Sequence, residues 1–290
     1  MGILIDDSTR VIVQGITGRI GSIQTRWMLA YGTKVVGGVT PGKGGSAVEG
    51  VPVFDSVEEA VKETGANASV FFVPAAFVLD AFLENVDAGI KLIVVIPEHV
   101  PVHDVMKMRA YAIEKGAIAL GPTTPGLLVP GKGKMGLMPA SLSLPGGVGI
   151  ISRSGTLSYE FAGILSEGRV GQSAVVGMGA DPVVLTNLGD ILRLFEEDED
   201  TDAVIIVGEV GGDQEENAAP FIKERMSKPV ATYIAGRYSP QGKYMGHAGA
   251  IIRGSGGTVD SKQEALRAAG AEVLKSPVDA RQWAKHHSLR

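Results

Sequence analysis

The sequence predicts an α/β protein with two domains, each built around a parallel β-sheet. The chain has 290 residues, which exceeds the usual size of a single domain and favours two domains of about 120 to 150 residues. Short runs rich in β-branched residues alternate with amphipathic segments in both halves, and this alternation is typical of parallel sheets covered by helices. The 40 glycines indicate many tight turns and close backbone contacts.

The first half contains five predicted strands with helical segments between them. The strands cover residues 11–14, 34–39, 68–73, 92–96 and 117–120, and the clearest helical segments cover residues 20–31, 57–64 and 102–115. Strands separated by helices of this length form right-handed βαβ units. We therefore predict that residues 1–121 form one α/β domain.

The alternation lapses once and then restarts. Residues 122–146 are rich in proline and glycine, which predicts a structured connector. Further strands are predicted at residues 148–151, 173–177, 203–208, 230–234 and 272–274, with helices between them. We predict a second α/β domain of flavodoxin-like type over residues 147–290.

Composition and charge exclude several classes of function. The net charge of −5 and the absence of a lysine- or arginine-rich run predict no nucleic-acid partner. The chain has no cysteine, so disulfides, thiolate metal sites and a cysteine nucleophile are excluded, and we predict no metal site. Asp6 and Asp7 stand where a secretory signal carries positive charge, and no apolar stretch approaches about 18 residues. We therefore expect a cytoplasmic protein without a membrane partner.

A glycine-rich loop follows the first predicted strand. The segment Gly15-Ile16-Thr17-Gly18-Arg19-Ile20-Gly21 has the pattern Gly-x-x-Gly-x-x-Gly and leads into a predicted helix. Glycines let the backbone turn sharply and approach a pyrophosphate, and a helix start offers free N–H groups and the positive end of the helix dipole. Between a strand and a helix, such a loop predicts a phosphate-binding site rather than only a tight turn.

The turn after the second predicted strand favours CoA over NAD as the ligand. A dinucleotide-binding protein usually carries Asp or Glu there to hold the ribose hydroxyls, but this chain reads Gly38-Val39-Thr40-Pro41-Gly42-Lys43-Gly44-Gly45. A glycine-rich turn with Lys43 suits a nucleotide that carries a further phosphate, as CoA does at its 3′ position. An NAD-dependent oxidoreductase is thus a disfavoured alternative.

Five histidines occur, and the surroundings of His247 differ from those of the others. Small residues flank His247 and leave its ring unobstructed. His286 and His287 lie in a polar C-terminal stretch, where we expect exposure to solvent, and His99 and His103 lie near the start of a helix, where capping or surface placement is expected. A lone histidine is more often structural than catalytic, so the prediction for His247 depends on its neighbours.

Two further segments supply suitable neighbours. Ser152-Arg153-Ser154-Gly155-Thr156 follows a predicted strand and begins a helix, an arrangement that binds anions through backbone N–H groups. Glu209 directly follows another strand, at the carboxyl edge of the sheet, where ligands bind in open α/β folds. With His247, these groups predict a phosphohistidine site. The sequence from Gly149 to Gly155 does not read Gly-x-Ser-x-Gly, which excludes a serine-hydrolase elbow.

These motifs, in this order, resemble the α subunits of succinyl-CoA synthetase (succinate–CoA ligase, ADP- or GDP-forming) over nearly the whole chain. The matching segments are Gly15-Ile16-Thr17-Gly18, residues 36–45, residues 152–157, Glu209-Val210-Gly211-Gly212 and Gly246-His247-Ala248-Gly249-Ala250. The resemblance implies an N-terminal CoA-binding Rossmann-like domain and a C-terminal ligase domain. It also implies a partner β subunit of ATP-grasp fold. This partner would be the main binding site for ATP or GTP with its Mg²⁺, and the two subunits would form an αβ or α2β2 assembly.

The resemblance also implies roles for individual residues. His247 would accept the phosphoryl group and Glu209 would orient its ring. The implied CoA contacts are Thr17, Gly18, Arg19, Ile20, Lys43, Ile96, Pro97 and Glu98, and the implied phosphate and acid contacts are Thr123, Thr124, Ser154, Gly155, Thr156 and Tyr159. A small dicarboxylic acid would be activated as an acyl phosphate and attacked by the CoA thiol. The sulfur nucleophile belongs to CoA, so the reaction requires no cysteine.

Two segments depart from the pattern of succinate-specific members. The chain reads Gly121-Pro122-Thr123-Thr124-Pro125-Gly126 where they usually have Gly-Pro-Asn-Cys-Pro-Gly, and Val183-Val184-Leu185 where they usually have small polar residues. Succinate is therefore the first expectation, and malate, citrate or another dicarboxylate are alternatives. A CoA-binding protein without catalytic activity is a further alternative, which the presence of His247 and Glu209 disfavours.

Overall fold

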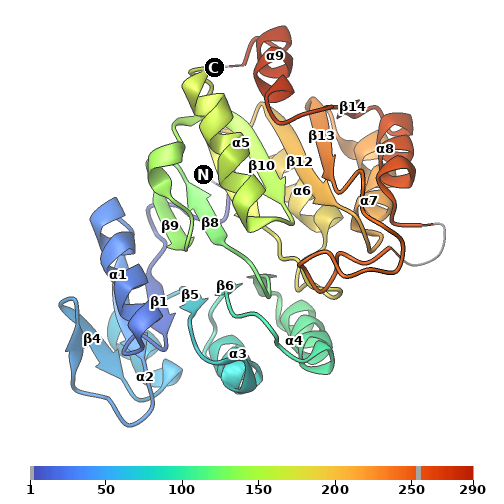
Figure 1. Cartoon of the computed structure of the whole chain (residues 1–290). Helices are drawn as coiled ribbons and strands as arrows, with labels where there is room; N and C mark the ends of the chain where they lie inside the picture. The colour runs from blue at the N-terminus through green and yellow to red at the C-terminus, as the bar shows by residue number, and fades with distance from the viewer. Residues whose placement is uncertain (1–2, 253–255, 290) are drawn as a thin grey trace.

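Two seven-stranded sheets with helices on both faces form the described part of the computed structural model, residues 3–252 and 256–289 (Figure 1). The strand order is β3-β4-β2-β1-β5-β6-β7 in the first sheet and β14-β13-β12-β10-β11-β8-β9 in the second. Most neighbouring strands are parallel. The predicted α/β fold class is confirmed.

The first sheet belongs to the N-terminal domain. Its strands are β1 (Val11–Gln14), β2 (Val35–Val39), β3 (Ala47–Val48), β4 (Val51–Phe54), β5 (Ala68–Phe71), β6 (Leu92–Val95) and β7 (Ile118–Leu120). Its helices are α1 (Arg19–Tyr31), α2 (Val57–Thr64), η1 (Ala75–Phe77), α3 (Val78–Asp87) and α4 (Val102–Lys115). β1 pairs with both β2 and β5, so the strand order reverses at β1. In open α/β sheets, ligands bind beyond the carboxyl ends of the strands at such a point.

The second sheet forms the C-terminal domain. Its strands are β8 (Gly126–Val129), β9 (Gly133–Gly136), β10 (Pro145–Ser152), β11 (Gln172–Gly177), β12 (Ala203–Glu209), β13 (Val230–Ala235) and β14 (Glu272–Val273). Its helices are η2 (Ala140–Leu142), α5 (Gly155–Glu167), α6 (Leu188–Glu197), α7 (Gln214–Arg225), α8 (Val259–Ala268) and α9 (Asp279–His286). The order reverses at β10, which pairs with β11 and β12. A second ligand site is therefore expected where α5 begins.

The hairpin of β8 and β9 is an element that the sequence analysis did not predict. It lies within residues 122–146, and β8 pairs antiparallel with β11, so it extends the second sheet. Leu127 and Met135 of the hairpin lie in one hydrophobic cluster with Val13 of β1 and Val176 of β11. The hairpin therefore joins the cores of the two domains.

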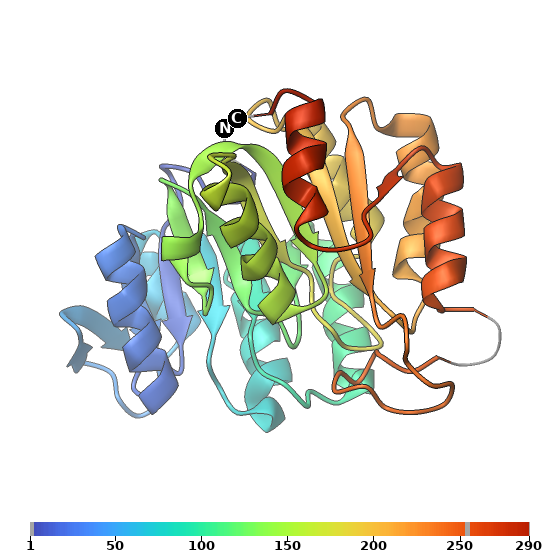
Figure 2. The ribbon, with the colours of Figure 1, turned by 45° about the horizontal axis from the view of Figure 1, so that its top comes forward.

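The helices of the second domain cover opposite faces of its sheet (Figure 2). Phe161 of α5 and Trp283 of α9 pack on one face, whereas Phe195 of α6, Ile222 of α7 and Leu266 of α8 belong to the cluster on the other. Residues 236–252, which follow β13, cross the edge at which β10 and β12 end (Figures 1 and 2). Among the described residues, no helix has the length and apolar character needed to cross a membrane.

Candidate active site

A histidine and a glutamate meet at the carboxyl edge of the second sheet. Glu209 is the last residue of β12, and His247 lies in the loop between β13 and α8. Nδ1 of His247 is 2.7 Å from Oε2 of Glu209. The Glu209 side chain is 8% exposed and the His247 side chain is 35% exposed. The carboxylate is thus the buried partner, and the ring reaches toward solvent.

The contact with Glu209 determines which ring nitrogen of His247 can react. A carboxylate at Nδ1 favours the tautomer with hydrogen on Nδ1, which leaves the lone pair on Nε2. Nε2 has no hydrogen-bond partner among residues 3–252 and 256–289. The hydrogen bond to Glu209 also raises the pKa of His247 above its ordinary value, and burial opposes this rise. Nε2 is therefore the nitrogen available to an electrophile.

The backbone around His247 is held by hydrogen bonds and by a close contact between Gly211 and Gly249. The N–H of Gly249 donates to the carbonyl of Ala180 at 3.0 Å, and the N–H of Ala250 donates to the carbonyl of His247 at 2.9 Å. Gly211 has φ +84°, and a Cβ there would lie 2.3 Å from the carbonyl oxygen of Gly249. A side chain at Gly211 would therefore push the histidine loop away from β12.

Arg153 connects Glu209 to the interior of the domain. It is 4% exposed, and its Nη2 lies 3.4 Å from Oε1 of Glu209. Its Nη1 donates to the carbonyl of Gly211 at 2.8 Å and to Oε1 of Glu215 at 3.3 Å. The 3.4 Å approach is an ion pair without hydrogen-bond geometry, because Oε1 of Glu209 has no hydrogen-bond partner among the described residues. Arg153 therefore balances the charge of the Glu209 carboxylate without a directed bond to it, and its Nη1 donates instead to the backbone carbonyl of Glu209 at 3.2 Å.

Behind Arg153 lies a buried pair of charges, Glu215 and Lys262. Both side chains are fully buried, and Nζ of Lys262 contacts Oε2 of Glu215 and, at 3.1 Å, Oε2 of Glu216. Glu215 also accepts the backbone N–H of Glu209 at 3.2 Å. Burial acts to raise the pKa of Glu215, but Arg153 and Lys262 more than offset it, and the pKa lies below its ordinary value. The sequence analysis did not assign a role to Arg153, Glu215 or Lys262.

His247 opens onto a cavity of about 690 Å³ between the two domains. Most of the residues predicted for the site line it, and the lining consists of Ile96, Pro97, Glu98, Thr123, Thr124, Pro125, Leu137, Pro139, Arg153, Gly155, Thr156, Tyr159, Ala180 and His247. The structure thus brings the strand-end segment of the first domain to the same cavity as the histidine of the second.

Gly155 and Thr156, at the start of α5, line this cavity and form a geometry that can bind an anion. Ser154 caps the helix, with its hydroxyl accepting the N–H of Leu157 at 3.4 Å. The N–H groups of Gly155 and Thr156 lie in the first turn, where no carbonyl of the helix can reach them. With the helix dipole behind them, they can bind phosphate.

Thr123 and Thr124 also line the cavity, but their hydroxyls are engaged differently. Thr124 is buried, and its hydroxyl donates to the carbonyl of Gly177 at 2.6 Å and accepts the N–H of Gly126 at 3.0 Å. Thr123 has φ +55° and donates to Oδ1 of Asp181 at 2.9 Å. Burial raises the pKa of Asp181. The hydrogen bond from the Thr123 hydroxyl and the nearby His247 oppose this rise. Of the two threonines, Thr123 is the one bonded to an ionisable group beside the site.

A second cavity, of about 600 Å³, lies at the edge of the first sheet. Thr17 and Gly18 line it, whereas Arg19, Ile20 and Lys43 do not. The other residues of the lining are Gln14, Gly15, Val39, Thr40, Pro41, Phe72, Val73, Pro74, Phe77, Asp80, Ala81 and Glu84. The predicted CoA contacts are thus divided between two cavities, because residues 96–98 line the first one.

The buried side-chain amide of Gln14 indicates that a ligand binds in the second cavity. Its side chain is 3% exposed, and Nε2 is buried without a hydrogen-bond partner among the described residues. A buried unpaired donor is costly, and a ligand with phosphate, hydroxyl or carbonyl oxygens would satisfy it. The residues present therefore fit a nucleotide such as CoA. The sequence analysis did not single out Gln14.

The prediction that the C-terminal histidines lie in an exposed polar stretch is only partly right. His286 is exposed, but it ends the helix α9. His287 packs against Trp283 with ring centroids 5.2 Å apart, and its Nε2 lies 2.6 Å from Oε1 of Glu272. His287 is only partly exposed to solvent, because Trp283 anchors α9 on the domain.

Comparison with known families and sequences gives a consistent result. Residues 6–99 match the CoA binding domain family, and residues 151–272 match the CoA-ligase family. The chain is 57% identical over 279 residues to succinate–CoA ligase [ADP-forming] subunit alpha 2 of Archaeoglobus fulgidus, covering 96% of this chain and 97% of that protein. It is 54% identical over 275 residues to the corresponding alpha subunit of Methanothermobacter thermautotrophicus, covering 95% and 93%.

Solved structures show the same fold. An ATP citrate lyase from Methanothrix soehngenii, in complex with citrate and coenzyme A, superposes with a TM-score of 0.89 at 25% identity. The match covers 98% of this chain and 50% of that one, so this chain spans half of the larger enzyme. A dinucleotide-forming acetyl-coenzyme A synthetase from Ca. Korarchaeum cryptofilum matches with a TM-score of 0.77 at 24% identity, over 97% of this chain and 61% of that one.

Proposed function

The chain belongs to the family of succinate–CoA ligase α subunits, and we propose that it carries the phosphoryl group of the reaction on Nε2 of His247. Family membership makes it a CoA ligase subunit that acts on succinate and binds CoA. The observation that carries the proposal is the contact between Nδ1 of His247 and buried Glu209, which leaves Nε2 free at a cavity wall.

The chemistry proceeds in three transfers. Nε2 of His247 attacks the terminal phosphorus of a nucleoside triphosphate and the diphosphate leaves. A carboxylate oxygen of succinate then attacks this phosphorus, giving an acyl phosphate and restoring neutral imidazole. Finally the CoA thiolate attacks the acyl carbon and phosphate leaves. Glu209 stabilises the positive charge that the phosphorylated ring carries and keeps the ring oriented.

The start of α5 is proposed to hold the phosphoryl group beside the histidine. The capped first turn offers the N–H groups of Gly155 and Thr156, and Ser154 fixes its geometry. Tyr159, whose hydroxyl donates to Thr156 at 3.3 Å, and Thr123 are proposed to contact the acid. Thr124 shapes this wall with its methyl group, because its hydroxyl is fully used by the backbone.

CoA is proposed to extend from the second cavity to the first. Thr17, Gly18 and Gln14 would bind its nucleotide part, with Lys43, Arg19 and Ile20 contacting it from the cavity edge. The segment Ile96-Pro97-Glu98 would guide the thiol arm, since these residues line the cavity of His247. Close glycine packing supports the tight loop, because a Cβ at Gly21 would lie 2.3 Å from the carbonyl oxygen of Gly15.

The name of the family implies a partner β subunit. We propose that this partner has an ATP-grasp fold and binds most of the ATP or GTP together with its Mg²⁺. We further propose an αβ or α2β2 assembly in the cytoplasm. The exposed side of His247, at 35%, supports delivery of the phosphoryl group from outside this chain.

Arg153, Glu215 and Lys262 are proposed as positioning residues that act through Glu209. Arg153 offsets the charge of Glu209, Glu215 holds its backbone N–H, and Lys262 keeps Glu215 ionised. Loss of Lys262 would remove a cation that pairs with the buried Glu215 carboxylate and leave that carboxylate to Arg153, which is costly. Glu215 and Lys262 do not line the cavity of His247, so they act on Glu209 without touching a substrate, whereas Arg153 also lines that cavity.

The test uses the chain in complex with its partner subunit. Labelled ATP and GTP should each be offered, and the label on this chain should be acid-labile and base-stable, present in the wild type and absent in His247→Asn. A panel of succinate, malate and citrate should then be assayed for CoA consumption, with succinate the fastest. No label on the wild type would refute the phosphohistidine, and a preference for malate or citrate would refute the acid.

A further inference from the structure

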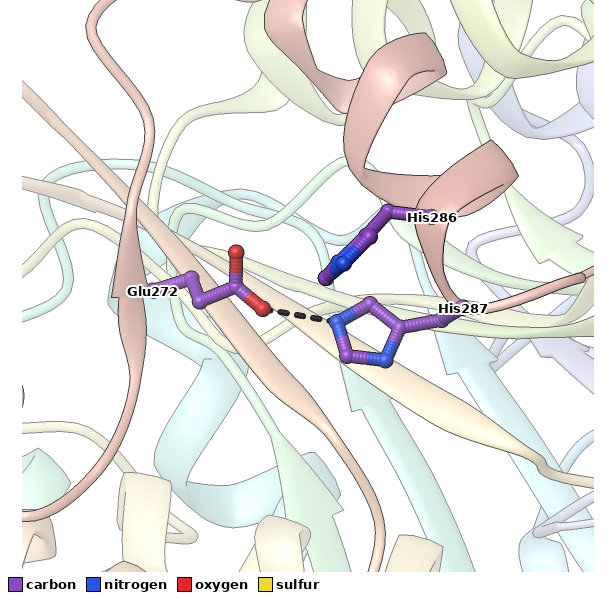
Figure 3. Close-up of side chains that lie close together, drawn as sticks. All are labelled: Glu272, His286 and His287. Carbon is purple, nitrogen blue, oxygen red and sulfur yellow. Dashed lines mark hydrogen bonds and ion pairs between the residues drawn. The ribbon is translucent and has the colours of Figure 1, made fainter.

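Three metal-ligating side chains converge at the edge of the second domain, outside the cavities described above. Glu272 of β14 faces His286 and His287 at the end of α9 (Figure 3). Nε2 of His287 lies 2.6 Å from Oε1 of Glu272. One ligand atom from each of the three residues lies within 4.8 Å of the others. Among the described residues this is the one group of three or more such ligand atoms.

The donor set is that of a zinc-class ion. Two imidazole nitrogens and one carboxylate oxygen suit Zn²⁺ and neighbouring transition metals, whereas Mg²⁺ and Ca²⁺ take oxygen ligands. In a tetrahedral site with bonds of about 2.0 to 2.1 Å, ligand atoms lie roughly 3.4 Å apart. His286 is exposed, so its ring can rotate to close the remaining gap.

We propose that Glu272, His286 and His287 bind one divalent transition-metal ion, with Zn²⁺ as the model, and that water completes its coordination. The ion takes the place of the hydrogen bond between His287 and Glu272. It ties the end of α9 to β14, the edge strand of the second sheet. The site does not depend on the phosphohistidine chemistry.

The backbone that carries the ligands is held in place before any ion binds. Trp283 and Ala284 of α9 are buried, and the Trp283 ring packs against the His287 ring. At the start of α9, Asp279 accepts the backbone N–H groups of Lys275 and Ser276 at 3.0 and 2.9 Å. This links the segment after β14 to the helix, so little reorganisation is needed for binding.

The nearness of Trp283 provides a direct readout. Cu²⁺ or Co²⁺ bound to His287 would quench the fluorescence of Trp283, and Zn²⁺ would compete without quenching. The chain has two tryptophans, so the experiment uses the full chain with Trp27→Phe. We expect saturable quenching with a Kd of about 10 µM or below, reversed by Zn²⁺, and a Zn²⁺-dependent rise in Tm.

Three variants assign the ligands. His286→Ala, His287→Ala and Glu272→Gln should each weaken Zn²⁺ binding at least about tenfold, while His103→Ala, at an exposed histidine, should leave it unchanged. Circular dichroism checks that each variant is folded, and a variant that fails to fold is replaced by the corresponding asparagine. Zn²⁺ binding that is weaker than about 1 mM, or that all three variants retain, would mean that the group is an ion pair only and would overturn the proposal.

Discussion

Two histidine–glutamate pairs in this chain have nearly equal lengths and opposite surroundings. The His247–Glu209 contact is 2.7 Å and the His287–Glu272 contact is 2.6 Å. In the first the glutamate is 8% exposed and in the second 51%. Arg153 lies close to the carboxylate of Glu209. In the cluster of Glu272, His286 and His287, the neighbours of the carboxylate are the two histidines.

The difference lies in the surroundings of the two contacts, and our assignment of the catalytic role to the first pair rests on those surroundings. A buried carboxylate with a fixed countercharge acts in low dielectric, where its influence on the ring is strong. An exposed carboxylate is screened by water and salt, and its contribution is small. Burial and the charges behind Glu209 thus suit the first pair to phosphoryl transfer, and accessibility suits the second to a metal ion.

The largest expected effect comes from matched substitutions of the two glutamates. Glu209→Gln should slow phosphorylation of the chain by about 10² to 10⁴-fold, because the Nδ1 hydrogen and the ring charge lose their carboxylate. Glu272→Gln should leave the rate within about twofold. Rapid-quench labelling of the complex measures both. Equal rates for the two variants would remove the distinction between the pairs.

Most of the fold and part of this site could be predicted from the sequence. The strand over residues 11–14 and the helices over residues 57–64 and 102–115 follow from periodicity and are confirmed. Glu209 and the Ser154–Thr156 turn follow from the rule that ligands bind where strands end and helices begin. These segments placed His247 and Glu209 in one predicted phosphohistidine site, and the family resemblance added that Glu209 orients the ring, because their separation in sequence gives no indication of a direct contact.

The charges behind Glu209 could not be predicted, for a physical reason. Glu215 and Glu216 open a helix and Lys262 lies in a polar segment, a pattern that normally indicates an exposed face. The burial of Glu215 and Lys262 depends on α7 packing against α8, which is a tertiary contact. The β8–β9 hairpin was missed similarly, because Gly133 and Gly136 weaken its strand pattern and its stability comes from pairing with β11.

The next effect is on stability. Lys262→Met should lower the free energy of unfolding by about 3 to 5 kcal/mol, because it leaves Glu215 buried without this partner. Glu272→Gln should cost about 1 kcal/mol or less. Denaturant unfolding of the full chain without added metal measures both. A cost for Lys262→Met as small as that for Glu272→Gln would show that the buried charges do not support the site.

A third effect is on pH dependence. The hydrogen bond to Glu209 raises the pKa of His247, and the neutral ring is the proposed nucleophile, so phosphorylation should slow as pH falls through this raised pKa. Glu209→Gln removes the cause, so the pKa of His247 should fall and the acidic limb of the residual rate should move to lower pH. Histidine NMR titration and the pH–rate profile test this. A shift toward higher pH would contradict it.

The smallest effect concerns Thr123, which lines the same cavity as His247. Thr123→Val removes the hydrogen bond to Asp181 and should lower kcat/KM for the acid by about fivefold, corresponding to about 1 kcal/mol. Thr123→Ser retains the hydroxyl and should recover most of the loss. Steady-state assays of the complex with succinate measure both. A loss in Thr123→Ser with no loss in Thr123→Val would show that the methyl group, and not the hydroxyl, matters.

The most direct measurement of the central claim identifies the phosphorylated atom. The complex, with its histidines labelled with ¹⁵N, is phosphorylated by nucleoside triphosphate, and ³¹P–¹⁵N couplings locate the phosphoryl group in the wild type and in His287→Asn. The account predicts phosphorus on Nε2 of His247 in both proteins, since Glu209 occupies Nδ1. Phosphorus on Nδ1 of His247, or on any other histidine, would contradict it.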